Sequence, residues 1–134
     1  MAVRISINNT EKLSKIIKNI TGVRLTSPIT GITTDSRDCK PGDLYIALLG
    51  DRSNGHHYLQ DVDTMDASAA LISEKNSNQK LNLHQIIVED TRKALGLIAN
   101  NWRNIFNIPV IAITGSNGKT STKELLYHVL KDKY

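Results

Sequence analysis

Cysteine is almost absent from this sequence, and Cys39 is the single example among 134 residues. One cysteine cannot form a disulfide within the chain, which fits a protein of a reducing compartment. Long apolar stretches are also absent, because no run extends beyond that of Leu44 to Leu49, whereas a membrane-spanning helix needs about 20 apolar residues. The amino terminus carries Arg4 early and shows no apolar segment typical of a signal peptide. We therefore expect a cytoplasmic protein with no membrane partner.

Charge is modest, with 17 Lys and Arg against 13 Asp and Glu and a net charge of +4. No basic run extends beyond a pair such as Arg92-Lys93, so the charge does not indicate a nucleic-acid partner. The histidines lack the spacing that places two metal ligands on one helix face. They are His56, His57, His84 and His128. We therefore expect no histidine metal site.

The most informative segment is an apolar run at 110–113 followed by a glycine-containing turn and a helical pattern from about Lys119 to Lys131. Strand, turn and helix in this order indicate a phosphate-binding loop. Gly115 and Gly118 allow a tight turn whose N–H groups can face phosphate oxygens, and the helix start adds the positive end of its dipole. The predicted nucleotide-binding residues are Gly115, Ser116, Asn117, Gly118, Lys119, Thr120 and Ser121.

Two of these residues are the predicted catalytic groups. Lys119 supplies a positive charge for the β- and γ-phosphates, and the Thr120 hydroxyl is a natural Mg²⁺ ligand. ATP and Mg²⁺ are therefore the expected cofactors. The general loop pattern has glycine five residues before Gly118, where this sequence has Ile113. A plain glycine-rich turn between a strand and a helix is the alternative interpretation.

The rest of the chain alternates between strand and helix patterns, which favours an α/β fold with a largely parallel sheet. The predicted strands are 29–34, 44–49, 69–73, 85–89 and 110–113, and the predicted helices are 10–21, 57–66, 91–106 and 119–131. Thr10 is the expected cap of the first helix. We predict a first domain at 1–107 and the start of a second, ATP-binding domain at 108–134. A single strand, loop and helix are too little for such a domain, so we expect the chain to stop inside it.

The segment Thr114-Gly115-Ser116-Asn117-Gly118-Lys119-Thr120 resembles the ATP loop of the Mur ligases, which build the peptide of bacterial peptidoglycan. That family shares the departure at Ile113. Thr34-Asp35-Ser36-Arg37, then Lys40 to Leu44 and Ala47 to His56, resemble the small N-terminal UDP-binding domain of two branches of the family. One branch adds the third residue of the peptide (MurE type), and the other adds D-alanyl-D-alanine (MurF type).

Asp90 to Leu95, Ala99, Trp102-Arg103 and Ser116 resemble the MurF type, with the MurE type as the alternative. The resemblance implies an ATP-dependent ligase that joins D-alanyl-D-alanine to UDP-N-acetylmuramoyl-tripeptide through an acyl phosphate. Further Mg²⁺ ligands and a carbamylated lysine of the family lie in central and C-terminal domains that this chain lacks. We therefore expect the chain to be inactive alone. A non-catalytic module that binds the UDP precursor is a second alternative.

The resemblance also implies a set of substrate-binding residues. They are Thr34, Asp35, Ser36, Arg37, Gly50, Asp51, Arg52, Ser53, Asn54, Gly55 and His56. Ser36 can bind a uracil edge or a phosphate, and Arg37 or Arg52 can offer a forked donor to a diphosphate. Two simpler interpretations stay open: a local pair between Asp35 and Arg37, and a solvated Arg52.

Overall fold

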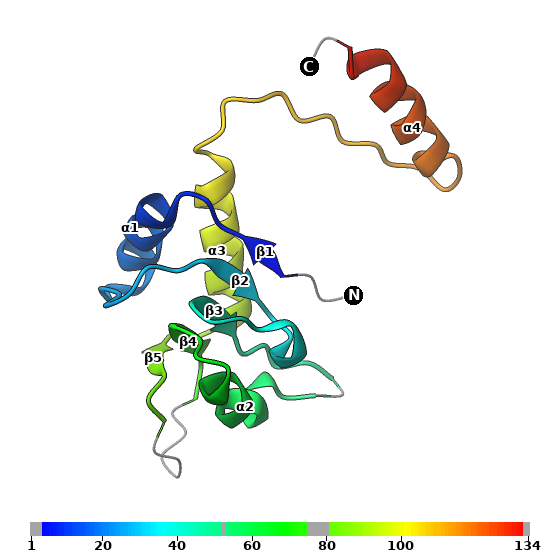
Figure 1. Cartoon of the computed structure of the whole chain (residues 1–134). Coiled ribbons are helices and arrows are strands. Elements are labelled where there is room, and N and C mark those ends of the chain that lie inside the picture. Colours follow the sequence, from blue (N-terminus) through cyan, green and yellow to red (C-terminus); the bar gives the residue numbers. More distant parts are fainter. Residues whose placement is uncertain (1–3, 52, 75–80, 133–134) are drawn as a thin grey trace.

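The computed structural model describes residues 4–51, 53–74 and 81–132. Figure 1 shows a sheet with helices on both faces and a final helix joined to it by an extended segment. The elements are β1 (Ile5–Ser6), α1 (Thr10–Thr21), β2 (Gly31–Thr33), η1 (Ser36–Asp38), β3 (Asp43–Ile46), η2 (Gly55–Tyr58), α2 (Leu59–Thr64), β4 (Ala69–Ile72), β5 (His84–Ile87), α3 (Thr91–Arg103) and α4 (Lys119–Leu130). The predicted α/β class is confirmed.

The sheet of the described residues has five strands in the order β1-β2-β3-β4-β5. Strands β2 to β5 are parallel, so Tyr45 of β3 pairs with Thr33 of β2 and with Ala70 of β4. The carboxyl ends of these strands therefore meet at one edge of the sheet. Strand β1 runs antiparallel to β2 and was not expected, because a two-residue edge strand leaves almost no alternation in the sequence.

The core has two parts because successive strand residues point to opposite faces of the sheet. Leu44 and Ile46 pack with α1 and α3 on one face, whereas Tyr45 and Ala47 pack with α2 on the other. Helices α1 and α3 also contact each other. The edge formed by the carboxyl ends is thus flanked by α2 on one side and by the start of α3 on the other.

Helix ends follow local chemistry, with small differences from the predicted bounds. The cap of α1 is Asn9, whose side chain accepts a hydrogen bond from the Lys12 N–H at 3.1 Å, and not Thr10. Gly22 ends this helix in the left-handed region at φ 73°, where glycine is favoured. Asp90 caps α3 by accepting from the Lys93 N–H at 2.9 Å. The predicted helix 57–66 is a 3₁₀ turn, η2, followed by the short α2.

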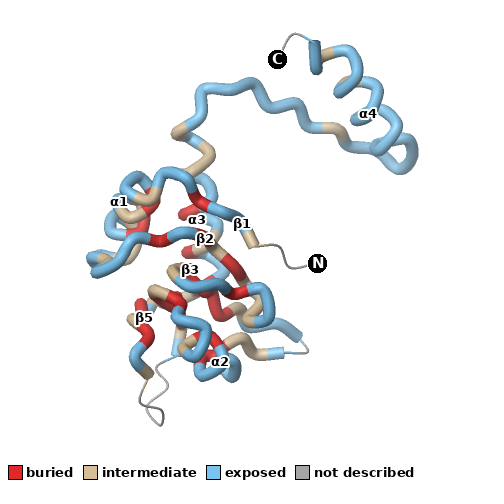
Figure 2. Tube along the Cα trace, viewed as in Figure 1, coloured by how far each residue is buried: buried red, intermediate tan, exposed pale blue. Residues whose placement is uncertain are grey.

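The segment after α3 differs most from expectation. The predicted strand at 110–113 is wrong as a strand: the segment is extended, and no described residue pairs with it. Val110 and Ile111 remain 66% and 61% exposed, and Leu125 and Val129 of α4 are 67% and 74% exposed. A parallel strand forms only against a neighbouring strand, which the described chain does not offer here. Figure 2 shows this region almost entirely exposed.

Among the described residues, no helix combines the length and the apolar character needed to cross a membrane. The buried apolar residues of this part of the chain run from Ile7 to Ile98, so α4 lies outside the core.

Candidate functional site

A cleft of about 610 Å³ lies at the carboxyl ends of β2 and β3. Residues from the ends of both strands, from η1, from the loop after β3, from α2 and from α3 line it. They are Thr34, Asp35, Ser36, Arg37, Tyr45, Leu48, Gly50, Ser53, Gly55, Tyr58, Asp61 and Arg92. In open α/β sheets this edge is the usual place for a ligand. Seven of the predicted substrate-binding residues thus share one cleft.

Asp35 and Arg37 form the local pair that the sequence left open. The Asp35 carboxylate accepts from the Arg37 Nε at 2.9 Å, from its Nη2 at 2.6 Å and from its backbone N–H at 3.0 Å. These hydrogen bonds from Arg37 lower the pKa of Asp35 to about 2. The pair therefore fixes the η1 turn, and Ser36 lies at the cleft between the two charged residues.

The loop after β3 is folded back on the strand from which it leaves. The Gly50 N–H donates to Ser53 O at 2.9 Å, and the Gly55 N–H donates to Leu48 O at 2.9 Å. A Cβ on Gly55 would lie 2.8 Å from Leu48 N, so only glycine fits this close approach. The Tyr45 hydroxyl donates to Gly55 O at 3.0 Å, and burial raises the pKa of Tyr45 to about 12. Arg52 lies outside the described residues.

His56 is placed behind this loop rather than in the cleft. The residue is 6% exposed, and both ring nitrogens are bonded to the protein. Nδ1 pairs with Asn54 Oδ1 at 2.7 Å, and Nε2 accepts from the Ser73 N–H at 3.0 Å. Burial lowers the pKa of His56. A direct substrate contact by His56 stays a prediction, while the geometry gives the ring a positioning role in this loop.

Asp51 and Asn54 were also predicted to bind substrate, and neither lines the cleft. The Asn54 side chain instead accepts from the His56 N–H at 2.9 Å and caps η2. Five further residues line the cleft and were not predicted from the sequence: Tyr45, Leu48, Tyr58, Asp61 and Arg92. Arg92 had a signal, because it stands in the first turn of a helix that follows a strand.

The predicted phosphate loop has the backbone that its glycines suggest. Gly118 adopts φ 76° and precedes α4 without any side-chain cap, so the first N–H groups of the helix can serve an anion. The Lys119 ammonium donates to Gly115 O across the loop. Lys119 and Thr120 line a hollow of about 280 Å³ together with Ile111, Ile113 and Lys123. These features fit the phosphates of a nucleotide.

The predicted Mg²⁺ site has fewer supporting features than the phosphate loop. No group of three or more His, Cys, Asp or Glu residues within the described ranges is arranged to hold a metal ion. Thr120 alone offers a hydroxyl beside Lys119. The donor set of the described chain thus fits a cation held mainly by phosphate oxygens, as Mg²⁺ often is.

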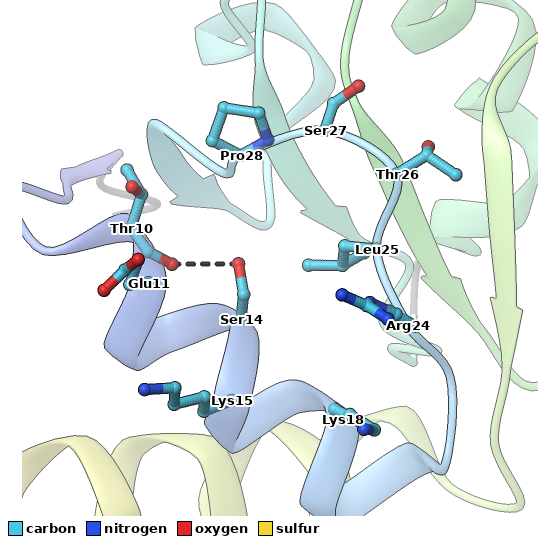
Figure 3. Close-up of a pocket in the computed structure, with 10 residues that line it drawn as sticks. All are labelled: Thr10, Glu11, Ser14, Lys15, Lys18, Arg24, Leu25, Thr26, Ser27 and Pro28. Carbon is cyan, nitrogen blue, oxygen red and sulfur yellow. Dashed lines mark hydrogen bonds between the residues drawn. The ribbon is translucent and has the colours of Figure 1, made fainter.

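A second hollow of about 440 Å³ lies along α1 and contains none of the predicted site residues. Figure 3 shows Lys15 and Lys18 of α1 and Arg24 of the following loop around it, with the Ser14 hydroxyl bonded to Thr10 O. It borders the segment that enters β2, at the amino end of that strand, whereas the first cleft lies at the carboxyl end. The two hollows are therefore separate.

Comparisons with known proteins match both parts of the chain. The model of the Mur ligase family catalytic domain matches residues 28–103, and the Mur ligase middle domain matches residues 113–134. A UDP-N-acetylmuramoyl-tripeptide--D-alanyl-D-alanine ligase from Synechocystis sp. is 37% identical over 118 residues, which are 88% of this chain and 26% of that protein. A UDP-N-acetylmuramoyl-L-alanyl-D-glutamate--2,6-diaminopimelate ligase from Syntrophomonas wolfei is 37% identical over 128 residues, 90% of this chain and 26% of that protein.

Solved structures give the same result. MurF from Acinetobacter baumannii superposes with a TM-score of 0.80 at 31% identity, over 90% of this chain and 27% of that one. MurF ligase from Thermotoga maritima in complex with ADP has a TM-score of 0.68 at 31% identity, over 76% of this chain and 23% of that one. The chain thus spans about a quarter of the length of the curated relatives it matches. Since the first family model covers more than half of its residues, the chain belongs to the Mur ligase family.

Proposed function

We propose that this chain contributes the UDP-binding domain (1–107) and the start of the ATP-binding domain (108–134) to an ATP-dependent ligase of the MurF type. The complete enzyme joins D-alanyl-D-alanine to UDP-N-acetylmuramoyl-tripeptide and so makes a peptidoglycan precursor. One observation carries the proposal: the cleft at the carboxyl ends of the strands and the phosphate loop occur in one chain that resembles MurF ligases over most of its length.

The cleft is the proposed site for the UDP end of the precursor. Its volume of about 610 Å³ lies within the usual range for small-ligand sites. Ser36 supplies a hydroxyl for hydrogen bonding, and the exposed Tyr58 supplies aromatic surface. A polar group beside an aromatic ring suits a nucleoside.

The phosphate loop is the proposed site for ATP, which supplies the phosphoryl group that converts a carboxylate into an acyl phosphate open to attack by an amine. Lys119 neutralises charge on the phosphates, and the first N–H groups of α4 orient them. Thr120 offers its hydroxyl to Mg²⁺. The structure of the Thermotoga maritima relative in complex with ADP supports the proposal that this loop binds a nucleotide.

A MurE-type ligase is the second candidate. The relative from Syntrophomonas wolfei, named as a diaminopimelate-adding enzyme, is as similar to this chain as the MurF relative from Synechocystis sp. is. The two types share the UDP portion of the precursor and differ in the peptide and in the added group. The cleft described here serves either one, so the choice depends on the acceptor peptide.

A substrate panel tests the proposal in the complete ligase that contains this chain. We expect phosphate release from ATP with UDP-N-acetylmuramoyl-tripeptide and D-alanyl-D-alanine, and none with UDP-N-acetylmuramoyl-dipeptide and a diamino acid. The reverse pattern assigns the enzyme to the MurE type. Phosphate release with neither pair contradicts both candidates.

A further inference from the structure

The cleft holds two arginines among its described lining residues, Arg37 of η1 and Arg92 of α3. Both could meet the diphosphate of a UDP ligand by residue type alone. Their hydrogen-bond and ion-pair partners differ, and this difference indicates which arginine is free to bind the diphosphate.

Arg37 is already committed to a carboxylate. Its Nε and Nη2 both donate to Asp35, in the side-by-side geometry that a phosphate would otherwise occupy. A phosphate brought to this guanidinium would also approach the negative charge of Asp35. Arg37 is therefore a poor first partner for a diphosphate, although its type and its place in the motif suggested that role.

Arg92 has no carboxylate within ion-pair distance in the described part of the chain. Its Nη2 makes one long contact, 3.4 Å to Leu49 O, which sets the guanidinium beside the loop that begins at Gly50. Most of its donors are thus left for a ligand. Asp90 is its nearest acidic neighbour in sequence, and that carboxylate caps the helix by accepting from the Lys93 N–H.

The backbone at Arg92 is fixed by a hydrogen bond of the neighbouring residue Thr91. The buried Thr91 hydroxyl donates to Ala47 O at 2.8 Å and so ties the first turn of α3 to the end of β3. Helix α3 has 13 residues, and the positive end of its dipole adds to the charge of Arg92. Asp61 lines the cleft from α2, which covers the other face of the sheet. The charges of the cleft therefore favour an anion on its α3 side.

We infer that Arg92 binds the diphosphate of the ligand in this cleft and so sets the preference for a nucleoside diphosphate over a nucleoside. This inference rests on the proposed function, because it assigns the phosphate contact within the proposed UDP site. In this arrangement the diphosphate lies toward α3 and the Gly50 loop. The nucleoside, with its hydroxyls, lies toward Asp61 and Tyr58.

Calorimetric titration of the 134-residue chain with UDP and with uridine tests the inference. Wild type should bind UDP more tightly than uridine. Arg92→Gln should weaken UDP binding by about 10- to 100-fold, as expected for a lost charged hydrogen bond, and leave uridine binding unchanged. The UDP affinity of Arg92→Lys should lie between those of wild type and Arg92→Gln, because lysine keeps the positive charge but cannot donate two parallel hydrogen bonds. Lys93→Gln, an equal charge change at an exposed residue outside the cleft, should leave both affinities unchanged.

Each contrary outcome has a distinct meaning. If Lys93→Gln loses as much UDP affinity as Arg92→Gln, the loss follows from the change in net charge and not from a contact by Arg92, and the inference is overturned. An equal loss of uridine binding in Arg92→Gln places the arginine at the nucleoside and overturns it as well. If folded wild type binds neither ligand, the proposed UDP site itself fails, and the inference falls with it. Circular dichroism of each variant establishes that it is folded.

Discussion

The His56 imidazole accepts a hydrogen bond from the Ser73 backbone N–H at 3.0 Å, and this contact ties the loop of the cleft to the end of β4. Nε2 must be unprotonated to accept, so the proton of the neutral ring is on Nδ1, which pairs with Asn54 Oδ1 at 2.7 Å. A protonated ring would present an N–H to the Ser73 N–H. The loop geometry thus depends on a neutral histidine.

This relationship predicts acid sensitivity of the fold. The pKa of His56 is lowered from 6.5 by burial, so below pH 6.5 the unfolded chain binds a proton that the folded chain resists. The contribution of neutral His56 to the free energy of unfolding, measured with urea, should be complete above pH 6.5 and decrease as the pH drops below that value. His56→Gln should flatten this dependence. His57→Gln, at an exposed neighbour, should leave it as in wild type, and an equal flattening there contradicts the assignment.

Gly55 should be intolerant of any side chain. A Cβ there would meet Leu48 N at 2.8 Å and Ala47 Cα at 2.9 Å, both of which are backbone atoms. Gly55→Ala should therefore destabilise the chain by about 1–3 kcal/mol and weaken UDP binding. Gly96→Ala in helix α3 is the matched control, because a Cβ there meets nothing within 4 Å. This substitution should stabilise the chain by about 0.5–1 kcal/mol. Thermal unfolding compares the two, and a neutral Gly55→Ala would show that the loop can relax.

Asp43 should be the most costly carboxylate to remove. It is fully buried and accepts from the Arg4 Nε and Nη2, each at 2.7 Å, and from the Lys40 N–H at 3.0 Å. Asp43→Asn leaves the Arg4 charge largely unpaired and should cost about 3–5 kcal/mol in unfolding free energy. Asp38→Asn, at an exposed residue of η1, should change it by less than about 0.5 kcal/mol. Comparable losses in the two variants would contradict the role given to the buried pair.

Lys119→Ala should separate the two sites of the chain. UDP binding should be unchanged, because the cleft is lined by residues between 34 and 92, whereas Lys119 lines a different hollow. In the complete ligase, turnover should fall by about 10²- to 10³-fold through loss of charge stabilisation. Lys131→Ala, beyond the end of α4, serves as the control for both assays. A parallel loss of UDP affinity in Lys119→Ala would mean a folding defect rather than a lost phosphate contact.

The fold was largely predictable because its strands are short apolar runs bounded by turn residues. The strands predicted at 44–49 and 69–73 are found at 43–46 and 69–72, and the helix predicted from Thr91 begins there. The segment at 110–113 has the same pattern and forms no strand in the described chain. Pairing, unlike periodicity, depends on a neighbour that lies elsewhere in the sequence.

The candidate site was predictable only where its residues stand together in a motif. Ser36 and Gly50 belong to such motifs and line the cleft. Arg92 and Asp61 reach the cleft from α3 and α2, on opposite faces of the sheet, and only the fold brings them together. His56 shows the converse: its place in the motif suggested a ligand contact, and the structure places it in the support of the loop.

Calorimetric titration of this chain with UDP-N-acetylmuramoyl-tripeptide tests whether the cleft is a UDP site. We expect binding at one site, weakened by Ser36→Ala and unaffected by Lys119→Ala. The matching peptide without UDP should bind far more weakly, because the cleft is proposed to hold the nucleotide. Failure of a folded chain to bind the UDP precursor, or equal binding of the peptide without UDP, would contradict the assignment of the cleft.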